Sequence, residues 1–271
     1  ETPATLNDTW GFKTDDHNWK SVETLLRLLA DIAGKGGNYL LNIGPRGDGS
    51  VVEFERDVLQ GVGKWVKQNA EAIYGTKATP FDKPFAWGNV TMKGNDLFAF
   101  VEDLPASQQI ELQRVTGKVS EVRLLASGEL CNFSQKGGVI KVELPKKSSE
   151  EFIPVIRIRF ENGFTVTPSI IVTGNRLSPQ NAVPLFGHSS LNYYGGYKSL
   201  IGYDWKVSRS KGKVFPKLLY TDSERGRSID IEIDGRRQHI VLDGSNPTTV
   251  KLEKSRVKWG NLYRKPGKGV F

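Results

Sequence analysis

The sequence predicts an α/β segment followed by two all-β segments, and two features of the hydrophobic pattern carry this prediction. The first is a short apolar run, Tyr39 to Ile43, which lies between two stretches of helical periodicity and is flanked by glycines and Pro45. The second is a change in period from 3.6 to 2 after Phe85. Helix, buried strand and helix in this order indicate an α/β unit of the kind found in parallel sheets and (β/α)8 barrels, and antiparallel β-sandwich-like domains follow. The predicted domains are 1–80, 81–172 and 173–271.

Residues 21–75 form the predicted helix–strand–helix unit. Ser21 is placed as the N-cap of its first helix and Gly34 as its stop. The apolar residues at helical spacing are Val22, Leu25, Leu26, Leu29, Ile32 and Ala33, then Phe54, Val58, Val62, Trp65, Val66 and Ile73 in one second helix. The strand 39–43 has few polar residues, so we expect it to be buried on both faces, as in a parallel sheet. We expect residues 1–20 to be loop, and the tight turn 44–50 to face the functional end.

This unit is too small to form a barrel by itself. A (β/α)8 barrel takes about 250 residues, whereas α/β character is confined to the first of the three predicted domains. A central parallel strand also needs a neighbour on each edge. The sequence begins at Glu1 without a methionine. We therefore expect the chain to be the C-terminal portion of a larger enzyme with an incomplete barrel, and we leave open whether the last domain ends at Phe271.

The two following domains are predicted from short strands separated by turn residues. In 81–172 the strands are Trp87–Met92, Leu97–Val101, Gln109–Leu112, Glu121–Leu125, Val139–Leu144 and Val155–Phe160. Many short strands with few helices indicate an antiparallel sandwich, whose default role is to cover the helices of the barrel. In 173–271 the predicted strands are Val214–Tyr220, Ser228–Ile233 and Gln238–Leu242.

Composition excludes several classes of protein. The 271 residues are 38% hydrophobic and 25% charged, as in ordinary globular proteins. No stretch approaches the roughly 20 apolar residues of a membrane span, and no signal segment is present in this chain. Cys131 is the only cysteine and the histidines are His17, His188 and His239, which argues against a disulfide and against a zinc site. We expect no metal and no organic cofactor.

The positive charge of the chain is concentrated in its last third. Residues 173–271 carry 18 basic and 8 acidic residues, a net charge of +10, within a total of +8 for the chain. Aromatic residues are interleaved with these cations, namely Tyr193, Tyr194, Tyr197, Tyr203, Trp205, Tyr220, Trp259 and Tyr263. Three roles stay open: a purely structural one, sugar binding by stacking, and binding of an acidic glycan by the cations. We expect no nucleic-acid partner.

Several motifs together resemble one enzyme family. They are the runs Glu1 to Phe12, Asn18 to Ser21, Gly36 to Pro45, Gly47 to Gly49, Gly63 to Trp65 and Asn69 to Thr76. In this order and spacing they resemble the end of the catalytic barrel of family 29 α-L-fucosidases. The resemblance implies a retaining exo-glycosidase that releases terminal L-fucose from fucosylated oligosaccharides or glycoconjugates, in a secreted, periplasmic or lysosomal-like location. The alternative is a non-catalytic fucose-binding or glycan-binding relative that has lost its nucleophile.

The same resemblance nominates two site residues. Glu1 matches a glutamate that serves in some members as general acid/base, and Trp10 matches an aromatic residue that packs against the apolar side of fucose. The family's nucleophile is an aspartate on an earlier barrel strand, which is absent from this chain. The alternatives are that Glu1 binds a sugar hydroxyl or braces a loop, and that Trp10 fills the barrel mouth. Asn42, a polar residue in the predicted buried strand, is expected to bond backbone or loop groups rather than substrate.

Overall fold

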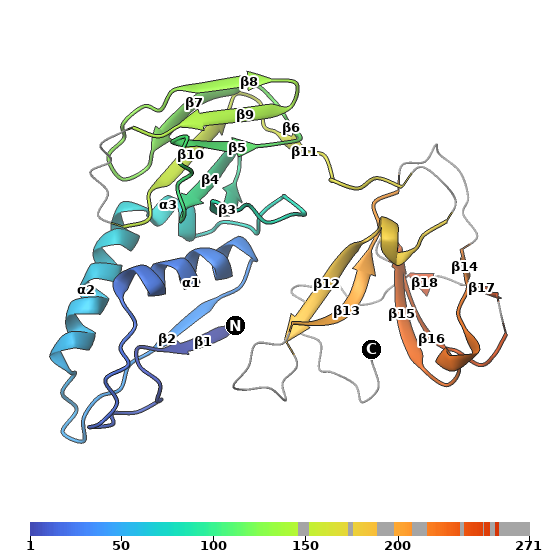
Figure 1. Cartoon of the computed structure of the whole chain (residues 1–271), viewed down its shortest axis with the longest axis horizontal. Coiled ribbons are helices and arrows are strands. Elements are labelled where there is room, and N and C mark those ends of the chain that lie inside the picture. The colour runs from blue at the N-terminus through green and yellow to red at the C-terminus, as the bar shows by residue number, and fades with distance from the viewer. Residues whose placement is uncertain are drawn as a thin grey trace. The chain divides into compact units, whose positions relative to one another are not determined.

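The computed structural model describes residues 1–145, 152–172, 176–188, 198–207, 216–233, 236–245, 247–249 and 253–254. The chain divides into two compact units, Glu1–Ser169 and Ile170–Phe271, which are considered one at a time (Figure 1). Among the described residues, no helix has both the length and the apolar character needed to cross a membrane.

The first unit begins with two parallel strands and the helix that connects them. Strands β1 (Thr2–Thr5) and β2 (Tyr39–Asn42) pair from Thr2 opposite Tyr39 to Thr5 opposite Asn42. Helix α1 (Val22–Gly34) begins as predicted at Ser21, whose hydroxyl accepts a hydrogen bond from the amide of Thr24. Because the strands are parallel, their carboxyl ends meet at one edge, and the loops that leave this edge lie side by side.

Two predictions for this region are wrong. Residues 1–20 are not all loop, because they include β1. The strand 39–43 is not buried on both faces: Leu41 packs against Leu25 and Val58, whereas Leu40 is 48% exposed. The reason is that, among the described residues, β2 pairs with β1 alone and the core lies on one side of it.

The second predicted helix is divided in two at Asn69. Helix α2 (Glu53–Gln68) ends there, and the one-turn helix α3 (Ala70–Ile73) follows. Asn69 is fully buried, and both its backbone amide and its side-chain Nδ2 donate to the carbonyl of Trp65 at 3.0 Å. An asparagine side chain competes in this way with the regular helical bonding pattern. Hydrophobic spacing does not reveal this break, because Ile73 still faces the same core as Trp65.

The remainder of the first unit is an antiparallel sandwich, as predicted. The four-stranded sheet has the order β3-β4-β10-β7, and the facing sheet has the order β5-β9-β8. All six predicted strands are present with ends within two residues, and the structure adds the short strands β6, β8 and β11. The bounds are β3 (Gly88–Lys93), β4 (Asp96–Val101), β5 (Gln109–Leu112), β6 (Val115–Thr116), β7 (Val119–Leu124), β8 (Phe133–Lys136), β9 (Val139–Glu143), β10 (Val155–Phe160) and β11 (Thr165–Val166).

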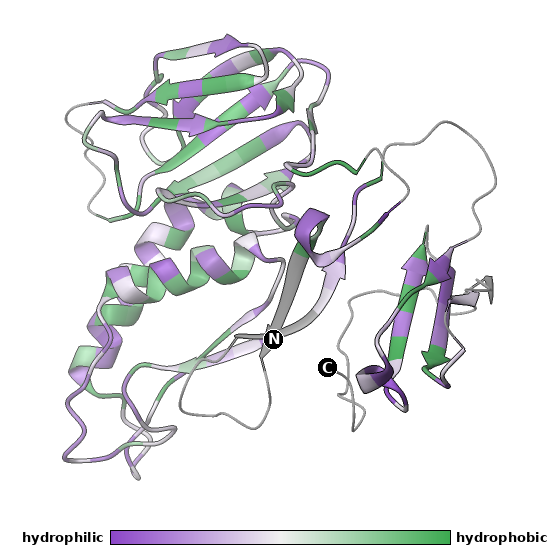
Figure 2. Ribbon diagram, turned by 45° about the vertical axis from the view of Figure 1, so that its right-hand side comes forward, coloured by the Kyte–Doolittle hydropathy of each residue, from purple (hydrophilic) through white to green (hydrophobic). Residues whose placement is uncertain are grey.

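The four-stranded sheet is covered by apolar side chains on both faces. On β4, Leu97, Ala99 and Val101 join the core between the two sheets. The alternate residues Phe98 and Phe100 face the helices and pack in one cluster with Leu26, Ala30, Trp65 and Ala72. In Figure 2, hydrophobic residues alternate with hydrophilic ones along strands of the sandwich and along the helices. The helices, the four-stranded sheet and the three-stranded sheet therefore form three layers with two cores.

Polar bonds attach the helical layer to the sheet at specific points. The indole Nε1 of Trp65 donates to the carbonyl of Ile153 at 2.8 Å, and the hydroxyl of Thr91 donates to the carbonyl of Ala72 at 2.8 Å. Both bonds are buried, where an unpaired partner would cost about 1–3 kcal/mol. The orientation of α2 and α3 on the sheet is therefore set by hydrogen bonds as well as by packing.

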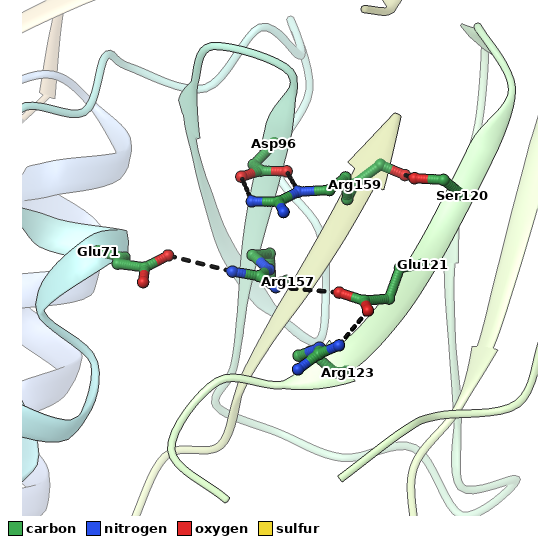
Figure 3. A network of polar contacts seen from close by, with 7 residues as sticks. All are labelled: Glu71, Asp96, Ser120, Glu121, Arg123, Arg157 and Arg159. Atoms are coloured by element: carbon green, nitrogen blue, oxygen red, sulfur yellow. Dashed lines mark hydrogen bonds and ion pairs between the residues drawn. The ribbon is translucent and has the colours of Figure 1, made fainter. Parts of the chain in front are cut away.

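Charged residues of β10 extend this contact toward the solvent (Figure 3). Arg157 pairs with Glu71 of α3 at 3.3 Å and with Glu121 of β7 at 2.9 Å, and its side chain is only 12% exposed. Arg159 makes a two-pronged bond to Asp96, with both distances 2.9 Å. Hydrogen bonds from Arg123 and Arg157 lower the pKa of Glu121. Arg157 and Arg159 alternate along β10 with the buried Ile156 and Ile158 and so lie on the opposite face of the strand.

The second unit is a separate set of small antiparallel sheets. These are β12 (Val183–His188) with β13 (Lys198–Asp204), β14 (Lys217–Leu218) with β17 (Thr248–Thr249), and β15 (Ser228–Ile233) with β16 (Arg236–Val241) and β18 (Glu253–Lys254). Its described core contains Ile240 and Leu242, with Leu218, Tyr220, Ile229 and Ile231 partly buried against them. The strand predicted at 228–233 is correct, β16 is close to its prediction, and β14 is shorter than predicted, with residues 214 and 215 outside the described residues.

The burial of Phe98 between helices and sheet gives a first prediction. Phe98→Ala removes a fully buried ring and leaves a cavity, so we expect the free energy of unfolding to fall by about 3–5 kcal/mol. The matched control is Phe133→Ala on β8, where the ring is partly exposed and the loss should be much smaller. Denaturant unfolding of both variants measures the difference. Equal losses would contradict a central role for the helix–sheet core.

Candidate functional site

The loop that follows β1 is organised around the carboxylate of Asp16. Asp16 is buried and accepts hydrogen bonds from the amides of Asp8 (3.0 Å) and Asn18 (3.1 Å) and from the hydroxyl of Thr9 (3.2 Å). Burial by itself raises the pKa of Asp16, but these bonds, together with the charge of Lys13, hold it below the ordinary value. The loop is therefore a folded structure with an ionised centre.

Asn42 connects this loop to the end of β2. Its side-chain Nδ2 donates to the carbonyl of Trp10 at 2.7 Å and to the carbonyl of Ile43 at 3.0 Å. This confirms the prediction that Asn42 bonds backbone groups of the neighbouring loops. The backbone of Trp10 is consequently held at the carboxyl end of the parallel strands.

Gly44 lets the two loops approach each other closely. Its amide donates to both carboxylate oxygens of Glu55, at 3.2 and 3.3 Å, and Glu55 is buried on α2. A Cβ atom on Gly44 would lie 3.0 Å from the carbonyl carbon of Gly11 and 3.1 Å from the amide of Phe12. Those neighbours are backbone atoms, which cannot move aside like the end of a flexible side chain. A glycine is therefore needed where the loop after β2 crosses the loop after β1.

Four exposed side chains lie on these two loops, and we call the set the aromatic platform: Trp10, Phe12, Ile43 and Arg46. Trp10 is 47%, Phe12 40% and Ile43 38% exposed. The guanidinium carbon of Arg46 lies 5.4 Å from the centre of the Phe12 ring. Large apolar groups beside a cation, at the carboxyl ends of parallel strands, suit a ligand with both C–H-rich and polar faces.

The turn that carries Arg46 is closed by its own hydrogen bonds. The amide of Arg46 donates to the carbonyl of Ser50 at 2.8 Å, and the amide of Gly49 donates to the carbonyl of Arg46 at 2.9 Å. Oδ1 of Asp48 accepts from both the amide and the hydroxyl of Ser50. The segment is thus the tight turn that the sequence predicts. The sequence analysis missed Phe12 and Arg46 as site residues. Each lies within two residues of a glycine in the sequence, Gly11 or Gly44, and these glycines could have indicated a close approach of the two loops.

The two site residues nominated from the sequence lie at opposite ends of β1. Glu1 is exposed and precedes Thr2, whose amide donates to the carbonyl of Asn38 at the start of β2. Trp10 follows β1 and is held at the other end of the pair by Asn42. Strand direction therefore places Trp10, but not Glu1, on the aromatic platform. His17 is an exposed loop residue.

The aromatic residues described in the second unit have structural contacts. The indole Nε1 of Trp205 donates to the carbonyl of Ser178 at 2.9 Å and to the side chain of Asn181 at 3.1 Å. The hydroxyl of Tyr220 donates to the carbonyl of Ser245 at 3.0 Å. The ring of Tyr203 lies 5.8 Å from that of Trp205. The remaining aromatic residues of the predicted set, Tyr193, Tyr194, Tyr197, Trp259 and Tyr263, lie outside the described residues.

The first unit contains a segment that is similar to a known protein family. Residues 1–71 match the family model described as Alpha-L-fucosidase. This match bears out the resemblance of residues 1–71 to the α-L-fucosidases of glycoside hydrolase family 29. An α-L-fucosidase from Branchiostoma floridae is 31% identical over 149 residues, which are 53% of this chain and 33% of that protein. Human plasma α-L-fucosidase is 31% identical over 148 residues, or 51% of this chain and 32% of that protein.

A solved fucosidase structure extends the similarity to the fold. α-L-fucosidase isoenzyme 1 from Paenibacillus thiaminolyticus is 35% identical, has a TM-score of 0.54, and covers 59% of this chain and 39% of its own. This chain therefore spans about a third of the length of the curated fucosidases that it matches. The aromatic platform lies entirely within the segment that matches the α-L-fucosidase family model.

The close approach at Gly44 gives a second prediction. Gly44→Ala should displace the loop that carries Phe12, because the added methyl group meets backbone atoms. We expect faster amide hydrogen exchange in peptides covering 10–12, measured by mass spectrometry. Gly47→Ala is the matched control in the same turn, since a Cβ there has no neighbour within 4 Å. Identical exchange in the two variants would show that the loops do not depend on this contact.

Proposed function

We propose that this chain forms the C-terminal part of a retaining exo-α-L-fucosidase, which hydrolyses terminal α-L-fucosyl linkages of glycans. The observation that carries the proposal is the family match over residues 1–71, which contain the parallel strands and the loops of the aromatic platform. The curated relatives in question are named α-L-fucosidases. A Thermotoga maritima α-fucosidase that is 27% identical, with a TM-score of 0.50, has been solved in complex with fucose.

In this proposal β1 and β2 are the last two strands of a (β/α)8 barrel. Each is followed by a helix, α1 or α2, and their loops leave from the carboxyl end. Substrate binds at that end in barrel enzymes. The exposed side of Leu40 on β2 is then the side that faces further barrel residues. The sandwich packs against the outer helices through Phe98, Phe100 and Trp65.

Trp10 is proposed to stack on the apolar side of fucose. An indole provides a wide, rigid face for C–H groups, including the methyl group of a 6-deoxy sugar, at little cost in rotamer entropy. The bond from Asn42 fixes the backbone of Trp10 at the carboxyl end of the strands. Retaining hydrolysis also needs two carboxyl groups about 5–5.5 Å apart. By resemblance, the nucleophile is supplied by an earlier barrel strand.

The third prediction compares this chain with the longer protein. The full-length protein should turn over an aryl α-L-fucoside, and the first sugar released should have the α configuration, as retention requires. Residues 1–271 alone should show no turnover, because two strands do not form a barrel and the proposed nucleophile is not among them. Fucose release is measured by colour and the anomer by NMR. Binding of fucose without turnover by the full-length protein would favour the non-catalytic relative.

The fourth prediction tests Glu1 in the full-length protein. If Glu1 is the general acid/base, Glu1→Gln should slow hydrolysis by roughly 10²–10⁴-fold. The loss should be smaller for substrates with good leaving groups, which need little protonation, and azide should rescue such a substrate. The position of Glu1 before β1 favours a bracing role instead, for which the loss is equal for good and poor leaving groups and azide has no effect. Steady-state kinetics on two aryl fucosides separates the two roles.

A further inference from the structure

The aromatic platform contains a cation, the guanidinium of Arg46, that the binding of fucose alone does not require. L-fucose is a neutral sugar, so recognition of its ring and methyl group needs no cation. Yet Arg46 lies over the exposed ring of Phe12, with 5.4 Å between the guanidinium carbon and the ring centre. An arginine in this geometry is attracted to the face of the ring, which limits the positions that its charged end can take.

Most donors of Arg46 are not used within the described part of the chain. A guanidinium has five N–H donors. Among the described residues, the hydrogen bond that it makes is from Nη1 to the hydroxyl of Ser50, at a long 3.4 Å. Asp48, the carboxylate of the same turn, instead directs its Oδ1 to the amide and hydroxyl of Ser50. These bonds from Ser50 lower the pKa of Asp48, and the charge of Arg46 helps to lower it further. The hydrogen bond of the Arg46 guanidinium in the described part of the chain is nevertheless to Ser50, which leaves most of its donors for a ligand.

The contacts between the two loops place Arg46 against Phe12, which follows Trp10 by two residues. Asn42 bonds the carbonyl of Trp10, and Gly44 lies against Gly11 and Phe12. If Trp10 stacks on fucose, Phe12 and Arg46 are the exposed groups of the same two loops that are available to what is attached to that sugar.

We infer that Phe12 and Arg46 form a subsite for the group attached to fucose, and that this subsite favours a group carrying a carboxylate or a sulfate. The inference rests on the proposed function. Phe12 supplies an apolar face for the adjacent sugar, and the two-pronged edge of Arg46 matches the paired oxygens of either anion. A bond of this kind contributes discrimination between substrates, because the hydroxyl groups of a neutral sugar accept weaker hydrogen bonds from the guanidinium than an anion does.

The fifth prediction concerns substrate preference in the full-length protein. The substrates are three fucosides that differ in the sugar next to fucose: a neutral hexose, a uronic acid and a sulfated hexose. Arg46→Gln should lower kcat/KM roughly tenfold for the two anionic substrates, the value of one hydrogen bond to a charged group. The loss of kcat/KM for the neutral substrate should be smaller, so that the ratio of anionic to neutral kcat/KM falls. A loss on one anion alone identifies the carboxylate or the sulfate as the ligand.

Matched variants separate recognition from general effects. Arg56→Gln removes an exposed arginine of α2 that pairs with Glu53 and Asp57, and it should leave the preference unchanged. Arg46→Lys keeps the charge but not the planar fork, so it should retain only part of the preference. Equal losses on neutral and anionic substrates, or no loss on either anion, would overturn the inference.

A readout without turnover keeps this test independent of the proposed function. Calorimetric binding of the same three fucosides gives the ratio of affinities for the anionic and neutral compounds. The ratio should fall in Arg46→Gln and decrease in the wild type as salt rises, because exposed charges are screened. If no substrate is hydrolysed, the proposed fucosidase activity fails while this ratio still decides the role of Arg46. An unchanged ratio rejects the subsite.

Discussion

The first unit depends on a single sheet that is apolar on both faces. Phe98 and Phe100 bind the helices from one side of β4, while Leu97, Ala99 and Val101 bind the second sheet from the other. A strand with this composition cannot be exposed on either side without a large loss of apolar burial. The helices that follow β1 and β2 are therefore held in place by the sandwich. They in turn support the loops at the carboxyl ends of those strands.

The same constraint reaches the aromatic platform through a short chain of contacts. Glu55 is buried on α2 and accepts from the amide of Gly44, and Gly44 lies against Gly11 and Phe12. Trp65 lies further along α2 than Glu55, and its indole Nε1 donates a hydrogen bond to the carbonyl of Ile153, next to the sandwich strand β10. The position of the platform is thus coupled to the sandwich by one helix. This gives the sandwich a role in placing the site even if it touches no substrate.

The parts of the fold that the sequence could predict are those that depend on local pattern. The cap at Ser21, the six strands of the sandwich and the turn 44–50 follow from spacing and from residue type. The parts that it could not predict depend on contacts between residues distant in sequence, or on a polar side chain that competes with the backbone for hydrogen bonds. Leu40 is exposed because the described core covers only the other face of β2, and the second helix breaks because Asn69 bonds Trp65. Phe12 and Arg46 become neighbours only when two loops, more than thirty residues apart, cross at a glycine.

Two turns with the same three-residue sequence have the same local structure but different surroundings. Asp48-Gly49-Ser50 and Asp243-Gly244-Ser245 have the same local bonds, since each aspartate accepts from the amide and the hydroxyl of its serine. In both cases these bonds lower the pKa of the aspartate. Their surroundings differ: the first turn carries Arg46 against Phe12, whereas the second is fastened by the hydroxyl of Tyr220, which accepts from the amide of Gly244. Local sequence fixes the shape of such a turn, and the residues that tertiary packing sets beside it determine what it can bind.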